Sequence, residues 1–267
     1  MTILVTGGRG AIARAVTTGL TAAGQDVRIA SREPADLGPT AIAYDPADPA
    51  PALEGVSQVF LYADPESAPA FVAAADAAGV KQVVLLSSLS AACGPDDPHA
   101  RTERIIASGG YATTRMQPGA FMSNAKFWAY QVRATGQIRL PYLDAEEAPI
   151  HEQDIADAVL QVLLDGPGHG HDDRAYPLTG PESMTRRRQI ALVTETTGVP
   201  IEAVDLTPDE ARAEMPMRDV GQRETLFAYW ASRVGTPHPI EPGVELLTGH
   251  TARPFTTWLT DNPGLFG

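Results

Sequence analysis

The sequence predicts an α/β fold, a doubly wound parallel sheet with helices on both faces, together with a smaller and mostly helical lobe. In the first half of the chain, short apolar runs alternate with amphipathic stretches, which is the pattern of successive strand–helix–strand units. The runs 57–62 and 81–87 are mainly apolar, as in strands that helices cover on both sides. With 267 residues, the chain is long enough for such a sheet and a second lobe.

The first half supplies the expected elements of the sheet. The apolar run 2–6 predicts the first strand, and the alanine-rich stretch 11–23, which follows a glycine turn, predicts the first helix. A second helix over 67–78 is expected to end at Gly79, because glycine commonly ends helices. We expect strands at 2–6, 27–31, 41–44, 57–62, 81–87 and 112–116, and helices at 11–23, 67–78 and 99–108.

The alternation loosens after Pro118-Gly119. The histidine- and glycine-rich stretch 166–173 predicts a loop, and few strand patterns follow it. We therefore expect a sheet domain over residues 1–165 and a helical lobe over residues 166–267, with a substrate cleft between them. The predicted helices of this half are 121–134, 153–164 (beginning near Asp154), 185–197, 208–214 and 219–234.

Composition excludes several classes of protein. The net charge of −13 argues against binding to nucleic acid or to an anionic membrane, because both need clustered lysine and arginine. Neither a membrane-spanning apolar run nor an export signal is evident, and one cysteine, Cys93, excludes an intramolecular disulfide. We expect a cytoplasmic protein that acts on a small molecule; the sequence leaves a homodimer open.

The turn after the first strand has the spacing Gly7-x-x-Gly10-x-x-Ala13 and leads directly into the first predicted helix. Glycine is needed where the turn requires positive φ and where a diphosphate approaches the backbone. The helix N-terminus then offers unpaired N–H groups and a partial positive charge to that diphosphate. This strand–turn–helix context predicts a dinucleotide site that contains Thr6, Gly7, Arg9, Gly10, Ala11 and Ile12.

The end of the second strand bears on which dinucleotide is bound. An acidic residue at this position would bind the 2′-hydroxyl of NAD, but the chain has Ser31-Arg32 there. Arginine suits the 2′-phosphate of NADP, and Arg9 can add a second positive contact. Glu33 would repel a phosphate unless its side chain points away. We therefore expect NADP(H) as the cofactor.

Polar residues after the next strands are further candidates for cofactor contacts. Asp45 can border the adenine, although an Asp-Pro turn explains it equally well. Tyr62 and Ala63 follow the fourth strand, near the path of the cofactor ribose. Ser87 and Ser88 follow the fifth strand, where a serine hydroxyl can bind the nicotinamide region or a substrate carbonyl, or can cap the turn.

Several segments together resemble an atypical short-chain dehydrogenase/reductase of the NmrA-like type. The resemblance implies an NAD(P)-binding Rossmann fold, usually with NADPH, and a C-terminal substrate lobe. Members include quinone and azo reductases, isoflavone-reductase relatives and redox-sensing regulators. By this resemblance Pro118, Gly119, Phe121 and Asn124 lie near the nicotinamide. The segments are Thr6-Gly7-Gly8-Arg9-Gly10, 27–32, Ala78-Gly79-Val80-Lys81, Leu86-Ser87-Ser88, 115–124, Asp154-Ile155-Ala156, 178–182 and 248–258.

The chain departs from the wider superfamily in its proton donor. Classical members carry a Tyr-x-x-x-Lys pair on the helix after the serine-bearing strand, with tyrosine as the proton donor. Here that helix, Asp97-Pro98-His99-Ala100-Arg101-Thr102-Glu103-Arg104, has neither residue. His99 can donate a proton near neutral pH or hold a ribose hydroxyl, or it can be a half-exposed residue of the first helical turn. We name His99 and Ser88 as candidate catalytic residues.

The remaining candidates lie in the second half of the chain. Phe121, Asn124, Trp128, Tyr130, Tyr142 and His151 are candidate substrate contacts, although aromatic residues at helical spacing also form cores. His169 and His171 occupy a glycine-rich loop whose spacing fits no standard metal motif, so we expect no metal.

These observations favour an NADPH-dependent reductase of a small aromatic or conjugated carbonyl compound such as a quinone. Two alternatives stay open: a dinucleotide-binding redox sensor without turnover, and a non-redox cyclase, isomerase or epoxide-opening enzyme. Fold alone does not separate them, because unrelated chemistries share it.

Overall fold

The computed structural model describes residues 1–62, 65–215 and 220–267, and the chain forms two compact units. Unit 1 contains Met1–Gly119, Glu152–Leu178 and Pro242–Thr251. Unit 2 contains Ala120–His151, Thr179–Glu241 and Ala252–Gly267. Each unit is therefore built from three separate stretches of the chain. The expected domain boundary near residue 165 stays a prediction.

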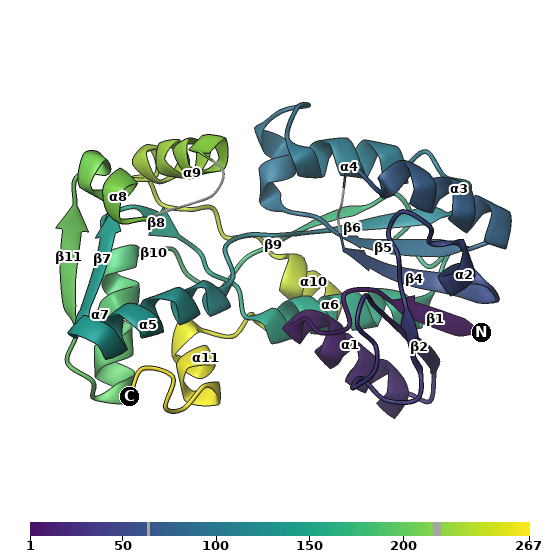
Figure 1. Ribbon diagram of the computed structural model, residues 1–267, viewed down its shortest axis with the longest axis horizontal. Coiled ribbons are helices and arrows are strands. Elements are labelled where there is room, and N and C mark those ends of the chain that lie inside the picture. Colours follow the sequence, from purple (N-terminus) through teal and green to yellow (C-terminus); the bar gives the residue numbers. More distant parts are fainter. Residues whose placement is uncertain (63–64, 216–219) are drawn as a thin grey trace. The chain divides into compact units, whose positions relative to one another are not determined.

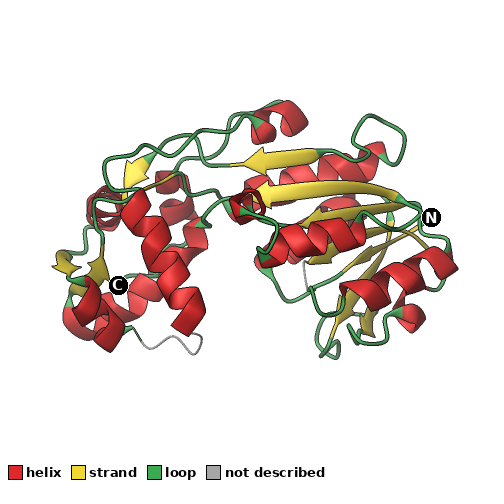
Figure 2. Cartoon of the chain, turned by 90° about the horizontal axis from the view of Figure 1, so that it is seen from above, coloured by secondary structure: helices red, strands yellow, loops and turns green. Residues whose placement is uncertain are grey.

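Unit 1 is built on a seven-stranded parallel sheet with the strand order β3-β2-β1-β4-β5-β6-β9. Figure 2 shows its strands in yellow, side by side and flanked by helices. This arrangement confirms the predicted doubly wound fold. The strands are β1 (Thr2–Val5), β2 (Asp26–Ser31), β3 (Ala41–Ala43), β4 (Val56–Tyr62), β5 (Gln82–Leu86), β6 (Ala112–Pro118) and β9 (Ala175–Leu178).

Helices cover both faces of this sheet (Figure 1). One face carries α1 (Ala11–Ala22), α6 (Glu152–Asp165) and α10 (Gly243–Thr248). The other carries α2 (Ala50–Leu53), α3 (Ala68–Ala78) and α4 (Pro98–Ile106), and a short 3₁₀ helix, η1 (Leu89–Cys93), precedes α4. The first face packs closely at Gly19, where a Cβ would lie 2.5 Å from Leu160 of α6. The other face is packed around Phe71 and Ala75 of α3, which meet buried strand residues such as Leu61 and Val83.

Unit 2 is mostly helical, as expected for the smaller lobe. Two short strand pairs join its segments: β7 with β11 in parallel, and β8 with β10 antiparallel. Trp128, Trp258 and Phe255 are buried in its main core. The elements are η2 (Met122–Ala125), α5 (Lys126–Thr135), β7 (Gln137–Pro141), β8 (Glu146–Glu147), β10 (Met184–Thr185), α7 (Arg186–Thr197), β11 (Glu202–Leu206), α8 (Pro208–Glu214), α9 (Val220–Ser232) and α11 (Phe255–Asp261).

The structure contains short elements that were not expected, namely α2, η1, β7, β8, β10, β11, α10 and α11, and it corrects the expected elements near the functional site in two further respects. Strand β9 was not expected, and it joins the sheet beside β6 as an edge strand, where Pro177 is tolerated because one side needs no hydrogen bonds. The helix expected over 121–134 begins as the 3₁₀ turn η2 and becomes α-helical only at Lys126. In the described part of the chain, no helix has both the length and the apolar character needed to cross a membrane.

Candidate functional site

A cavity of about 660 Å³ in unit 1 lies where β1, β2 and β4 end. Because these strands are parallel, their carboxyl ends meet at one edge of the sheet, where ligands bind in folds of this type. Six predicted cofactor residues line it: Thr6, Gly7, Arg9, Ser31, Arg32 and Tyr62. The other lining residues are Ala30, Glu33, Tyr44, Pro46, Leu61, Ser67, Ala68 and Phe71.

At the glycine loop, a ligand or a neighbouring strand can come closer to the backbone than the side chain of any other residue type would permit. Gly7 has φ +67°, in the left-handed region. At Gly8, a Cβ would lie 2.3 Å from Ile29 Cγ2, so glycine lets the loop pack against β2. Gly10 is the N-cap of α1 and offers no capping side chain. The Ala11 and Ile12 amides, at the start of the helix, have no intrahelical acceptors. This cradle fits a diphosphate.

Arg9 and Arg32 both line the cavity but differ in their partners. Arg9 Nη1 donates to Asp36 Oδ2 at 3.1 Å, and Nη2 donates to the Glu33 carbonyl at 2.9 Å and to Asp36 Oδ1. The hydrogen bond from Arg9 lowers the pKa of Asp36. Arg32 is exposed, and no described residue forms an ion pair with it. Arg32 is therefore the lining cation that is available for an anionic ligand.

The residues around Arg32 shape the end of β2. Ser31 is buried, and its hydroxyl lies 3.2 Å from both the amide and the carbonyl of Glu33. The Glu33 carboxylate is 84% exposed and lies 3.9 Å from Arg9 Nη2. Its charge is thus partly offset by Arg9, which reduces the repulsion that a nearby phosphate would meet.

Thr6 ties the glycine loop to β4. Its hydroxyl donates to the Phe60 carbonyl and accepts from the Tyr62 amide, both at 3.0 Å. The Tyr62 ring lies against the glycine loop, and burial raises the pKa of its phenol. Ala63, the other residue expected there, lies outside the described residues.

Asp45 forms the Asp-Pro turn that the sequence analysis gave as the alternative to a contact with adenine. Its Oδ1 accepts from the Ala47 amide at 2.9 Å, and a backbone bridge joins Asp45 to Asp48. It does not line the cavity. Its contact with adenine stays a prediction.

Ser87 and Ser88 follow β5, as expected, but their side chains have different partners. Ser87 Oγ donates to Glu103 Oε1 at 2.5 Å, and the same oxygen accepts from Gln117 Nε2 at 2.8 Å. Ser88 Oγ accepts from the Ser90 amide at 3.1 Å and caps η1. Glu103 therefore ties α4 to the carboxyl ends of β5 and β6.

His99 is the second residue of α4 and is partly buried. Its amide donates to Asp97 Oδ1 at 2.8 Å, so Asp97 is the N-cap. Glu103 is one helical turn further on and so lies on the same face as His99. The sequence analysis missed Glu103 and Gln117, although the spacing His99-x-x-x-Glu103 reproduces that of the superfamily's Tyr-x-x-x-Lys pair with different side chains.

The segment after β6 leads from unit 1 into unit 2. Pro118 ends β6, and the Gly119 amide donates to the Leu178 carbonyl at 2.9 Å, which extends the pairing with β9. Phe121 and Asn124 belong to unit 2. Phe121 forms a backbone bridge with Ile150, and Asn124 is exposed.

The other candidate substrate residues occupy different environments within unit 2. Trp128 is only 6% exposed and belongs to the core, so its burial favours the structural alternative. Tyr130 is 74% exposed on α5. Tyr142 packs edge-on against Phe227, with ring centroids 6.1 Å apart. His151 is buried, and its Nε2 lies 3.3 Å from Asp261 Oδ2. Their roles toward a substrate stay predictions.

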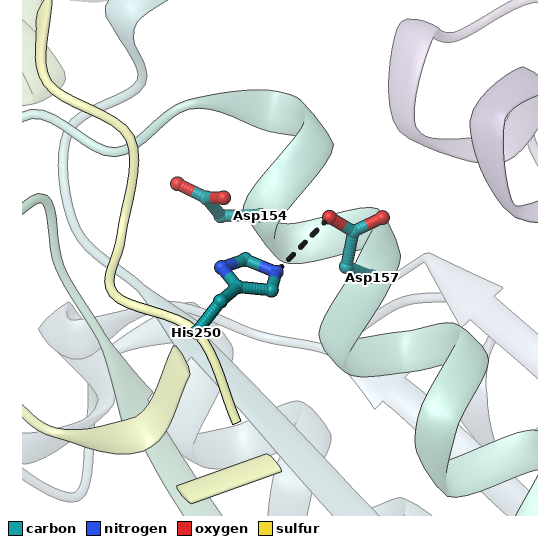
Figure 3. A group of neighbouring side chains, drawn as sticks. All are labelled: Asp154, Asp157 and His250. Atoms are coloured by element: carbon teal, nitrogen blue, oxygen red, sulfur yellow. Dashed lines mark ion pairs between the residues drawn. The ribbon is translucent and has the colours of Figure 1, made fainter. Parts of the chain in front are cut away.

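A second group of polar side chains in unit 1 includes Asp154 and Asp157 of α6 and His250, which follows α10 (Figure 3). One ligand atom from each lies within 4.8 Å of the others, close enough to share a metal ion. Nε2 of His250 lies 3.4 Å from Asp157 Oδ2, and its Nδ1 lies 3.0 Å from the Thr251 carbonyl. The contact between His250 and Asp157 links α6 to the segment after α10, and this link explains without a metal ion why the three side chains lie close together. The expectation of no metal stays a prediction.

Comparisons with known proteins point to one family. A family model described as NAD(P)H-binding matches residues 7–166, a range that includes the glycine loop. The (4-alkanoyl-5-oxo-2,5-dihydrofuran-3-yl)methyl phosphate reductase of Streptomyces griseus is 34% identical over 286 residues, which cover 99% of each chain. The NAD(P)H azoreductase of Xenophilus azovorans is 28% identical over 81% of this chain and 79% of its own.

Solved structures share the fold. The NADPH-dependent quinone oxidoreductase of Escherichia coli, complexed with NADPH, is 23% identical and has a TM-score of 0.81. The match covers 97% of this chain and 99% of that chain.

Proposed function

The chain belongs to the NAD(P)H-binding family, as an atypical short-chain dehydrogenase/reductase of the NmrA-like type, and on this basis we propose that it is a cytoplasmic NADPH-dependent reductase. Its proposed substrates are small aromatic or conjugated carbonyl compounds. The observation that carries the proposal is the cavity at the carboxyl ends of the strands, which is lined both by the glycine loop and by an arginine without an ion-pair partner among the described residues.

The residues of unit 1 fit the adenosine half of NADPH. The glycine loop and the amides of Ala11 and Ile12 would hold the diphosphate, because a helix N-terminus without a capping side chain offers donors to an anion. Arg32 would bind the 2′-phosphate, since its guanidinium is not engaged by a described carboxylate. Arg9 would support this site less directly, because Asp36 and the Glu33 carbonyl already hold it.

The chemistry of the proposed substrates suits the side chains near β5 and α4. When bound, NADPH supplies the hydride. A quinone or conjugated carbonyl that accepts a hydride delocalises the resulting negative charge onto oxygen, so it depends less on a strong proton donor than a simple ketone does. The helix that bears His99 has neither tyrosine nor lysine. We assign His99 as the residue that donates the proton and Ser88 as a hydrogen-bond donor to the substrate oxygen.

The names of the relatives support this choice of substrates. One acts on a dihydrofuranone whose ring double bond is conjugated with the oxo and alkanoyl groups, and others are an azoreductase and a quinone oxidoreductase. The dihydrofuranone and the quinone are conjugated carbonyl compounds, the class of substrate that we propose for this chain.

A panel of acceptors tests the proposal. Purified protein would be mixed with NADPH or NADH and with quinones, acylated dihydrofuranones, azo dyes and simple ketones, while oxidation of the nicotinamide is followed by absorbance. We expect turnover of conjugated acceptors with NADPH, slower turnover with NADH and little with simple ketones. Tight NADPH binding with no oxidation by any acceptor would favour the redox sensor, and product formation without a cofactor would favour the non-redox enzyme.

A further inference from the structure

The side chain of Tyr62 fills the space that the glycine loop leaves open. A Cβ at Gly7 would lie 2.7 Å from Tyr62 Cε2 and 2.8 Å from Cδ2, so the ring rests directly on this residue. A Cβ at Gly10 would lie 2.8 Å from the Tyr62 hydroxyl oxygen. The two glycines of the dinucleotide motif therefore face one tyrosine.

The hydroxyl of Tyr62 is directed at the N-terminus of α1. Burial raises the pKa of this phenol, and the Ala13 amide, in the first turn of the helix, counteracts part of the rise by hydrogen bonding to the oxygen. The ring also packs edge-on against buried Phe60, with centroids 5.5 Å apart. The oxygen thus lies at the helix terminus where a phosphate oxygen is stabilised in dinucleotide sites.

We propose that the Tyr62 side chain competes with the cofactor diphosphate for the glycine loop and thereby sets the affinity of the protein for dinucleotides. This inference rests on the proposed function, because it takes the glycine loop as the diphosphate site. Tyr62 lines the same cavity as Arg32, so a ligand that extends from Arg32 to the helix N-terminus meets the ring. The ring must leave Gly7 and Gly10 before a diphosphate can contact the backbone there.

Competition of this kind has a distinct thermodynamic signature. When only a fraction of the protein has the ring displaced, the apparent dissociation constant of any ligand that needs the loop rises in inverse proportion to that fraction. The effect is equal for NADPH and NADH, because both carry the same diphosphate. It is absent for adenosine 2′-monophosphate, which has no diphosphate and still carries the phosphate expected at Arg32.

Titration calorimetry on three variants tests the proposal. Tyr62→Ala is expected to bind NADPH and NADH each about tenfold more tightly than the wild type, with unchanged affinity for adenosine 2′-monophosphate. Tyr62→Leu retains apolar volume against Phe60 and guards against loss of folding in the alanine variant; it is expected to tighten binding in the same way. Tyr62→Phe removes only the hydroxyl and is expected to give a smaller gain, because the ring still covers Gly7.

Two results would overturn this inference without contradicting the proposed function. If Tyr62→Ala and Tyr62→Leu bind the dinucleotides as tightly as the wild type or more weakly, the ring does not compete. If a crystal structure of the wild type with NADP⁺ retains the ring over Gly7 and Gly10, the inference is equally wrong, whatever the variants do. By contrast, failure of both the wild type and Tyr62→Ala to bind either dinucleotide would contradict the proposed function itself.

Discussion

Arg9 and Arg32 line one cavity, but among the described residues a carboxylate holds only Arg9. Asp36 binds both terminal nitrogens of Arg9, so this side chain is directed toward the loop that follows β2. Arg32 also lines the cavity, and none of the residues that the structure describes forms an ion pair with it. The two arginines therefore differ in what they can offer to a phosphate, although the sequence presents both as candidates.

Replacement of Arg32 tests the assignment of the 2′-phosphate. Arg32→Ala is expected to weaken NADPH binding by about tenfold to a hundredfold, the usual effect of losing a hydrogen-bonded charge pair, and to leave NADH binding unchanged. Arg14→Ala is the control, because Arg14 is an exposed arginine on α1 that does not line the cavity. Equal losses for the two dinucleotides, measured by calorimetry, would show that Arg32 does not bind the 2′-phosphate.

Replacement of His99 separates a catalytic role from a structural one. His99→Ala is expected to lower kcat with a quinone by about a hundredfold, within the range typical of a proton donor, and to leave the Kd of NADPH unchanged. His169→Ala, which alters an exposed histidine in the loop after α6, is the control. A kcat within twofold or so of the wild-type value would show that solvent delivers the proton.

Glu103 is expected to stabilise the carboxyl ends of β5 and β6. Glu103→Ala leaves the Ser87 hydroxyl and the Gln117 amide without their shared acceptor. The expected cost is about 2 kcal/mol of unfolding free energy, or roughly 4–8 °C in Tm. Glu103→Gln retains an oxygen at this position and is expected to lose less than half as much. A thermal melt that ranks the two variants in the opposite order would contradict this explanation.

Tyr111 offers a stabilising substitution. Its hydroxyl is buried, and no described residue forms a hydrogen bond with it. Because an unsatisfied buried hydroxyl costs about 1–3 kcal/mol, Tyr111→Phe is expected to raise Tm by about 2–12 °C. Tyr176→Phe is the matched control, since the Tyr176 hydroxyl lies 2.8 Å from His171 Nδ1 and its removal is expected to lower Tm. A lower Tm for Tyr111→Phe would show that its hydroxyl has a partner, such as water.

Asp165 is expected to make stability depend on pH. Burial acts to raise the pKa of this carboxyl, but hydrogen bonds from His171 and Gln161 outweigh it and lower the pKa below the usual value. Ionised Asp165 therefore stabilises the fold above about pH 4, and this contribution is lost as the pH falls through the lower, folded-state pKa. The Tm of the wild type is expected to exceed that of Asp165→Asn at neutral pH, and the difference to shrink in acid. A difference that grows in acid would contradict this sign.

Periodicity predicted the strands and helices of unit 1 except where the pattern is too short to detect. The runs that became β4 and β5 are apolar because helices cover both faces of the sheet, and such runs can be recognised locally. β9 has only four residues, including a proline, and it forms a strand because it pairs with β6, which lies far away in the sequence. Local propensity does not contain that information.

The candidate site likewise has one part that the sequence predicts and another that depends on contacts between distant elements. The glycine loop could be predicted because its function depends on backbone conformation and on neighbours along the chain. The ion pair between Arg9 and Asp36, the contact of Tyr62 with Gly7, and the links from Glu103 to Ser87 and Gln117 join different elements. Which of several polar residues meet depends on the packing of those elements, so the sequence shows the candidates without showing the pairs.

A single-turnover reaction tests the central claim most directly. Protein in excess over NADPH would be mixed rapidly with one quinone acceptor, and the absorbance and fluorescence of the reduced nicotinamide would be followed. If the protein is a reductase, both signals are expected to disappear in an amount equal to the NADPH added, and the same amount of hydroquinone is expected to form. NADPH that stays bound and reduced in the presence of the quinone and of the other conjugated acceptors would contradict the account.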